Sequence, residues 1–197
     1  MEEGLVRYRA SDGTMVSMAP ARLVGLLAGG TFVSDEDAAM IVARCQARGL
    51  NPLGGDAYVV VRGGHAQLQV SKDYYLRTAS AQESYDGLDA GVVVAKADGT
   101  LERRRGCLVS ANPKVEKLVG GWCEVYDTKR RHPSYAEVSL EEYDQRQSLW
   151  KTKPATMIRK VAVVQALREA YPDAFTGVYD EAEMPVTEVD GDGGQVE

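Results

Sequence analysis

Residues 148–168 read SLWKTKPATMIRKVAVVQALR, a long run of apolar positions with basic side chains among them. Pro154 suits the first turn of a helix, and Pro172 cannot continue one, so we expect a helix from Pro154 to about Tyr171. At 100° per residue its apolar side chains fall on nearly all sides of the helix. This pattern predicts a long helix buried in the centre of the fold.

Three cations, Arg159, Lys160 and Arg168, interrupt the apolar pattern of this helix. A buried cation is costly unless it is paired, so each must extend to solvent, meet an internal carboxylate, or reach a groove that an anion fills. The sequence leaves two of these interpretations open, an internal ion pair and an anion-binding groove.

The rest of the chain predicts an α+β fold. Alternating apolar residues at 5–9 and 15–18 indicate an N-terminal hairpin. Helices are then expected from Pro20 to about Gly29 and after Ser34, whose hydroxyl suits a helix N-terminus.

A second hairpin is predicted at 57–62 and 66–70, followed by a helix over 72–81 that Ser71 caps. Three further strands, at 88–96, 105–110 and 121–127, are expected to form a small antiparallel meander, and an extended segment at 135–138 and a short helix from about Leu140 follow it. We expect one core domain over 1–184 and a disordered, flexible acidic tail over 185–197.

Charge is distributed unevenly along the chain, which carries a net −6 over 197 residues. Residues 173–197 hold eight acidic and no basic side chains, so the remainder carries +2. Residues 129–168 hold nine basic and four acidic side chains, a net +5. A polyanion is therefore a plausible ligand for this region despite the acidic total.

The chain lacks the usual sequence signatures of an enzyme or a metal protein. It has no Walker A motif, no GxSxG elbow and no CxxC pair, and its cysteines and histidines are few: Cys45, Cys107, Cys123, His65 and His132. The stretch Asp190–Gly193 is a poor match to a calcium loop. We therefore predict no catalytic residue and no metal site, and we keep a metal-dependent nuclease or DNA-processing accessory protein as the alternative.

Several fragments, in order along about three quarters of the chain, resemble the RecT/Bet (Red-beta-like) family of phage single-strand annealing proteins. They include GLNP at 49–52, GDAY at 55–58, VSKD at 70–73, GGWCEVY at 120–126 and the segment Trp150–Arg168. The resemblance continues through FTGVYDE at 175–181.

This resemblance implies a protein that binds single-stranded DNA without sequence preference and anneals complementary strands without ATP, as an oligomeric ring or helical filament. It implies single-stranded DNA, an annealed duplex intermediate and further copies of the chain as partners, together with a phage exonuclease and, as a further candidate, a host single-strand-binding protein. No cofactor is required, and Mg²⁺ is a candidate modulator of DNA binding. The acidic start of the chain and the absence of a long apolar run predict a cytoplasmic protein without a membrane partner.

The resemblance and the local charge together single out a set of DNA-binding candidates: Lys72, Arg77, Lys129, Arg130, Trp150, Lys153, Arg159, Lys160 and Arg168. Two interpretations of Trp150 are open: it packs in the core, or it contacts a nucleotide. Two are also open for Lys129 and Arg130: they are solubilising charges of a turn, or they contact phosphates. The run Arg103–Arg105 is expected to be a solvated strand end, opposed by Asp98 and Glu102, and is left out of the set.

The match departs from the family pattern in two places. Ala155 and Val161 occupy positions that can be basic in other members, so a cationic track here must be assembled differently or be weaker. Relatives commonly continue into a separate C-terminal domain that docks the exonuclease or the host single-strand-binding protein, whereas this sequence ends in the acidic tail. Two roles remain open for it, covering the basic groove and keeping the protein soluble.

Overall fold

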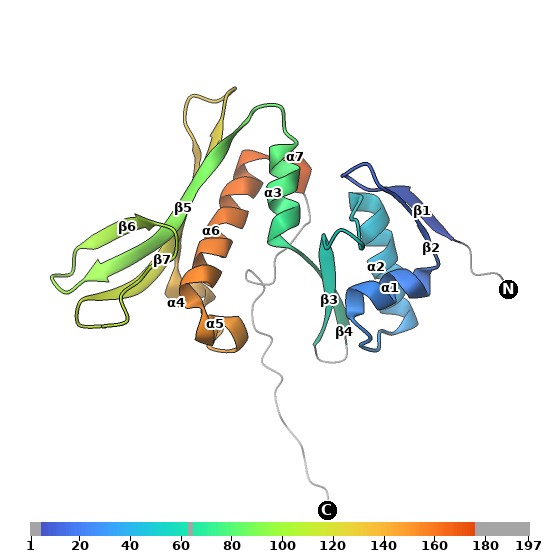
Figure 1. Ribbon diagram of the computed structural model, residues 1–197, viewed down its shortest axis with the longest axis horizontal. Helices are drawn as coiled ribbons and strands as arrows, with labels where there is room; N and C mark the ends of the chain where they lie inside the picture. Colours follow the sequence, from blue (N-terminus) through green and yellow to red (C-terminus); the bar gives the residue numbers. More distant parts are fainter. Residues whose placement is uncertain (1–4, 63–64, 176–197) are drawn as a thin grey trace, which may run out of the picture.

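A computed structural model describes residues 5–62 and 65–175 of the chain. The expected tail at 185–197 and the domain boundary after residue 184 fall outside these residues. The described part is a mixed α+β structure with several helices and three antiparallel sheets. Figure 1 shows it as an elongated molecule, with the N-terminal elements at one end of the long axis and strand β6 at the other.

The N-terminal lobe, residues 5–70, follows the sequence expectation closely. It contains two hairpins and two helices between them: β1 (Val6–Arg9), β2 (Met15–Met18), α1 (Pro20–Ala28), α2 (Asp35–Arg48), β3 (Ala57–Arg62) and β4 (His65–Val70). Pro20 is the first residue of α1, and the Ser34 hydroxyl accepts a hydrogen bond from the Asp37 N–H at 3.2 Å. Gly49 ends α2 in the left-handed region, with φ 57°.

The C-terminal lobe is built on one four-stranded antiparallel sheet and the helices beside it. Its elements are α3 (Lys72–Ser80), β5 (Tyr85–Lys96), β6 (Leu101–Arg105), β7 (Glu116–Asp127), β8 (Ser134–Ser139), α4 (Leu140–Tyr143), α5 (Ser148–Thr152), α6 (Pro154–Ala170) and α7 (Pro172–Phe175). The helices α3 and α6 and the strand β8 match their predicted ranges to within a few residues. The short helices α5 and α7 were not predicted.

Two predictions about the sheet are wrong. The second strand is Leu101–Arg105 and not 105–110, because Gly99, with φ 84°, closes a tight β5–β6 turn and Gly106, with φ 83°, ends the strand. The strands do not form a meander either, because the sheet order is β6-β5-β7-β8 and β7 pairs with β5. The loop between β6 and β7 returns the chain past β5, to its other edge.

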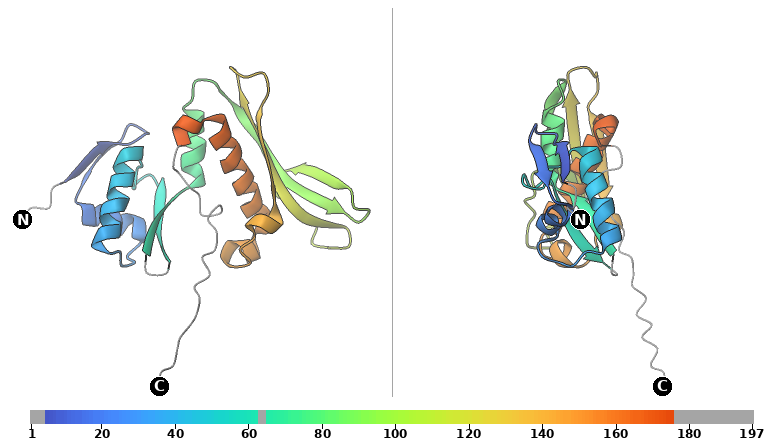
Figure 2. Two further views of the ribbon diagram at one scale, coloured as in Figure 1. Left: turned by 180° about the vertical axis from the view of Figure 1, so that it is seen from behind. Right: turned by 90° about the vertical axis from the view of Figure 1, so that its right-hand side faces the viewer.

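Helix α6 lies across one face of the sheet, against β7, β8 and β5, while α3 and α7 pack on its other side (Figures 1 and 2). Its side chains Ile158, Val161 and Leu167 have no exposed surface. Gly121 of β7 allows the close approach, because a Cβ atom there would lie 2.5 Å from the Ile158 carbonyl oxygen. Helix α6 is therefore the element on which the lobe is assembled. Within the described ranges, no helix is both long and apolar enough to cross a bilayer.

Candidate nucleic-acid interface

The junction between α5 and α6 exposes a short basic turn. Lys153 links the two helices: its N–H donates to the Leu149 carbonyl oxygen at 2.7 Å, and its own carbonyl accepts from the Met157 N–H at 3.1 Å. Pro154 follows as the first residue of α6, where its missing N–H costs no hydrogen bond. The side chains of Lys151 and Lys153 are exposed on this turn.

We define the α5–α6 basic segment as Arg146, Lys151, Lys153, Arg159 and Lys160. Among the described residues, no carboxylate lies within 4.0 Å of the cationic nitrogens of Arg146, Lys151, Lys153 or Arg159. Lys160 is half-buried on α6 and already interacts with another group of the protein. These four cations have no carboxylate partner among the described residues, so their positive charge is available to an anion.

Arg159 connects this segment to the sheet. Its Nε donates to the Ala90 carbonyl oxygen of β5 at 3.3 Å, and its side chain is half-buried. That bond uses one of the five N–H donors of a guanidinium. The group is therefore fixed in place while further donors remain for an acceptor.

Trp150 is in the hydrophobic core, with 3% of its surface exposed. Its indole nitrogen is buried and has no acceptor among the described residues. Of the two roles that the sequence leaves open, the structure shows the packing one, at the entrance of α6. A nucleotide contact by Trp150 stays a prediction.

Lys129 and Arg130 lie in the β7–β8 turn, near the C-terminal end of α6. The Lys129 ammonium is 2.9 Å from the Glu83 carboxylate, and both side chains are exposed. Arg130 donates to the Ala170 carbonyl oxygen at 2.6 Å and to the Ser134 hydroxyl at 3.1 Å. A cation at this position satisfies a terminal carbonyl of α6 and complements its dipole, so Arg130 has a structural role whether or not it meets DNA.

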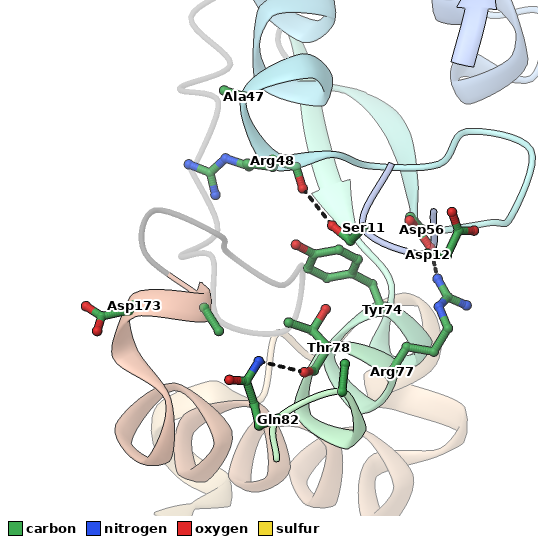
Figure 3. Close-up of a pocket in the computed structure, with 12 residues that line it drawn as sticks. Ser11, Asp12, Ala47, Arg48, Asp56, Tyr74, Arg77, Thr78, Gln82 and Asp173 are labelled. Carbon is green, nitrogen blue, oxygen red and sulfur yellow. Dashed lines mark hydrogen bonds and ion pairs between the residues drawn. The ribbon is translucent and has the colours of Figure 1, made fainter. Parts of the chain in front are cut away.

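Arg77 of α3 forms an ion pair with Asp56, a carboxylate that is 1% exposed (Figure 3). The other oxygen of Asp56 accepts the Asn51 N–H at 2.7 Å, and the Asn51 side chain donates to Asp12 at 2.8 Å. These contacts join the GLNP fragment to α3 and to the first hairpin. The structure thus gives Arg77 a partner inside the fold, and a phosphate contact by Arg77 stays a prediction.

The remaining candidates are spread along α3 and α6. Lys72 is the first residue of α3 and is half-buried. Arg168 is half-buried in the last turn of α6 and already interacts with another group of the protein. The predicted residues therefore fall into three groups, at the start of α6, at its end and on α3. Over 17 residues α6 spans about 25 Å, so the first two groups do not share one contact site.

Sequence reasoning left Arg146 and Lys151 out of the candidate set. Both contribute to the positive charge of 129–168, and this charge count is the signal that would have found them. Arg146 also has φ 55°, a left-handed conformation that is uncommon for a residue other than glycine. Arg146 lies in the loop between α4 and α5.

Two of the three cysteines are buried, and the described residues hold no cluster of metal-binding side chains. Burial raises the pKa of the Cys45 thiol and of the Cys123 thiol to about 12, so both stay neutral packing residues at physiological pH. Across residues 5–62 and 65–175, no three His, Cys, Asp or Glu side chains converge in a way that could hold a metal ion.

Comparison with known proteins identifies the family. Residues 14–194 match the RecT family, and this range covers β2, the β3–β4 hairpin, the four-stranded sheet and helix α6. The chain belongs to the RecT family. It is also 30% identical over 151 residues to a protein of Ureaplasma parvum serovar 3 described as "Uncharacterized protein UU154". That alignment covers 75% of this chain and 61% of the relative, so this RecT-family chain spans about three fifths of the relative's length.

Proposed function

We propose that the protein binds single-stranded DNA without sequence preference and anneals complementary strands without ATP, as an oligomeric ring or helical filament. The observation that carries this proposal is the α5–α6 basic segment, which holds four cations without a carboxylate partner among the described residues, in a chain of the RecT family.

The chemistry of annealing explains why cations suit the task. An annealing protein holds the phosphates of a strand while its base edges stay free to pair. Lys and Arg side chains bind phosphates without reading sequence. Lys151 and Lys153 are exposed just before α6, and the Arg159 side chain is held to β5 by its hydrogen bond to the Ala90 carbonyl oxygen.

We infer that the reaction has no catalytic residue and requires no cofactor, with Mg²⁺ acting only on DNA affinity. Strand pairing is itself favourable, so a protein that aligns two strands needs no hydrolysis step. The proposed partners are single-stranded DNA, the annealed duplex, further copies of the chain, a phage exonuclease and a host single-strand-binding protein. We propose that it acts in the bacterial cytoplasm.

A salt titration of oligonucleotide binding tests the interface. For single strands, log affinity falls with log salt by about 0.7 for each phosphate that is neutralised. The double variant Lys151→Gln and Lys153→Gln should weaken binding about tenfold and reduce the slope by about 1.4. The matched control is Arg7→Gln with Arg44→Gln, which removes two exposed cations of the N-terminal lobe and should leave affinity and slope unchanged. Equal effects of both double variants would reject the α5–α6 basic segment as the interface.

A further inference from the structure

Cations on or near α6 differ in whether another group of the protein already interacts with them. Five of the DNA-binding candidates have such a partner: Lys129, Arg130, Arg159, Lys160 and Arg168. By contrast, Lys151 and Lys153 are exposed, and no carboxylate among the described residues lies within 4.0 Å of their ammonium groups. These two lysines are available to carboxylates from outside the described residues.

The carboxylates closest in sequence to these lysines do not neutralise them. Glu141 and Glu142 are exposed on α4, and Asp144 accepts the Arg146 N–H at 2.8 Å. Residues 141–160 hold five cations and three carboxylates, a net +2. The stretch that contains the lysines therefore keeps a positive charge after its own carboxylates are counted.

The sequence that follows the described residues carries the opposite charge. Residues 185–197 contain four carboxylates and no Lys or Arg: Glu188, Asp190, Asp192 and Glu197. The stretch lacks a periodic apolar pattern, so charge is the main property by which another surface can recognise it.

The number of residues after Phe175 determines which carboxylates of this sequence can reach the start of α6. Helix α6 joins α5 at one end and α7 at the other, and it is about 25 Å long (Figures 1 and 2). A fully extended chain spans at most about 3.3–3.6 Å per residue. Glu183 is eight residues beyond Phe175 and would need an almost fully extended chain, whereas Glu188 is 13 residues beyond it and has length to spare.

We propose that the carboxylates of residues 185–197 pair with Lys151 and Lys153 of the same chain, and that DNA displaces them when it binds. Opposite charge and sufficient length select this segment, and its covalent connection gives it an effective concentration on the order of 1 mM. Exposed ion pairs are individually weak, so the contact is partial and yields to the many phosphates of a DNA strand. The segment is thus an internal competitor of DNA for two lysines.

The contact itself does not depend on DNA binding, but its regulatory effect rests on the proposed function. If the two lysines meet phosphates, the apparent DNA affinity is reduced by the fraction of chains in which they are free. For one or two exposed ion pairs this reduction is about two- to fivefold. Salt screens the contact, since the Debye length falls from about 8 Å at 0.15 M to about 3 Å at 1 M. The segment therefore limits DNA binding mainly at low ionic strength.

Two variants with the same change in charge test the contact. The distal variant carries Glu188→Gln, Asp190→Asn, Asp192→Asn and Glu197→Gln. The proximal variant carries Asp173→Asn, Asp180→Asn, Glu181→Gln and Glu183→Gln. Each variant removes two Asp and two Glu carboxylates, so the two differ in how far the removed charges lie from Phe175 along the chain.

Labelling with an amine-reactive reagent, performed without DNA and quantified by mass spectrometry, measures the contact. In the distal variant the reactivity of Lys151 and Lys153 should rise about two- to fivefold. Lys114 and Lys117, which are exposed before and at the start of β7, are the reference lysines and should not change. The proximal variant should label like the parent chain.

Three results of this labelling would overturn the contact. The first is equal labelling of Lys151 and Lys153 in the parent chain and the distal variant. The second is an equal rise in both variants, or a rise at the reference lysines as well, which indicates a general effect of charge. The third is labelling of the parent chain that changes with protein concentration, which assigns the contact to the segment of a second copy.

Binding of an oligonucleotide too short to span two copies measures the regulatory effect. At low salt the distal variant should bind it more tightly than the parent chain, by the same factor as the change in labelling, and the difference should diminish as salt increases. Lys151→Gln with Lys153→Gln should abolish the effect of the distal changes. A distal effect of unchanged size without these lysines would contradict the competition.

Failure of this inference is separate from failure of the proposed function. A parent chain that shows the labelling contact but does not bind the oligonucleotide rejects the function and retains the contact. A parent chain that binds the oligonucleotide, with a distal variant that labels and binds as the parent does, rejects the contact and retains the function.

Discussion

Replacing Gly121 with Ala should destabilise the protein by moving helix α6 away from the sheet. A Cβ atom at this position would lie 2.5 Å from the Ile158 carbonyl oxygen and 3.1 Å from the Arg159 backbone nitrogen. Both are backbone atoms of α6, so no side-chain rotation relieves the overlap. The cost of overpacking a well-packed core is about 1–3 kcal/mol.

Urea denaturation measures this cost directly, and thermal melting should show a decrease of about 2–10 °C for a chain of this size. Gly25→Ala is the matched control. Gly25 lies in the exposed part of α1 with no atom within 4 Å of its missing Cβ, so alanine there should stabilise the protein by up to about 1 kcal/mol. Equal stabilities of the two variants would refute the close packing of α6 on β7.

Three further predictions concern ion pairs and the tail. Arg77→Met should lower the free energy of unfolding in urea by roughly 1–3 kcal/mol, because it leaves buried Asp56 without its cation. The slope of log DNA affinity against log salt should stay unchanged, and a reduced slope would show that Arg77 contacts phosphate. The hydrogen bond from Arg103 holds the pKa of Glu137 below its ordinary value, so the stability of the protein should fall as the pH decreases from about 5 through that pKa. Glu137→Gln should make this decrease shallower, and an unchanged pH profile would contradict the ion pair. Removing residues 185–197 should leave the melting temperature unchanged and tighten DNA binding, because the stretch lacks periodic apolar residues and carries four carboxylates; a lower melting temperature would indicate that it packs on the fold.

Local signals in the sequence were sufficient for most of the helices and hairpins. Pro20, Ser34 and Ser71 mark helix starts: α1 begins at Pro20, and α2 and α3 begin directly after Ser34 and Ser71, whose hydroxyls accept a backbone N–H. The sheet was harder, because pairing depends on residues far apart in the chain. The order β6-β5-β7-β8 follows from the path of the loop between β6 and β7, for which the sequence has no local signal.

The candidate site was predictable as a basic region but not residue by residue. The charge count of 129–168 found the region that contains the α5–α6 basic segment. It did not distinguish cations that are free to bind an anion from cations that hold the fold, since partners such as Asp56 for Arg77 and the Ala170 carbonyl for Arg130 are distant in sequence. Only the folded geometry separates the two kinds.

The measurement that tests the central claim most directly is annealing of two complementary oligonucleotides without ATP, followed by fluorescence. The parent chain should accelerate pairing over the rate without protein. The double variant Lys151→Gln and Lys153→Gln should lose most of that acceleration, and the Arg7→Gln and Arg44→Gln control should keep it. A parent chain that binds neither strand, or that pairs strands equally well without Lys151 and Lys153, would contradict this account.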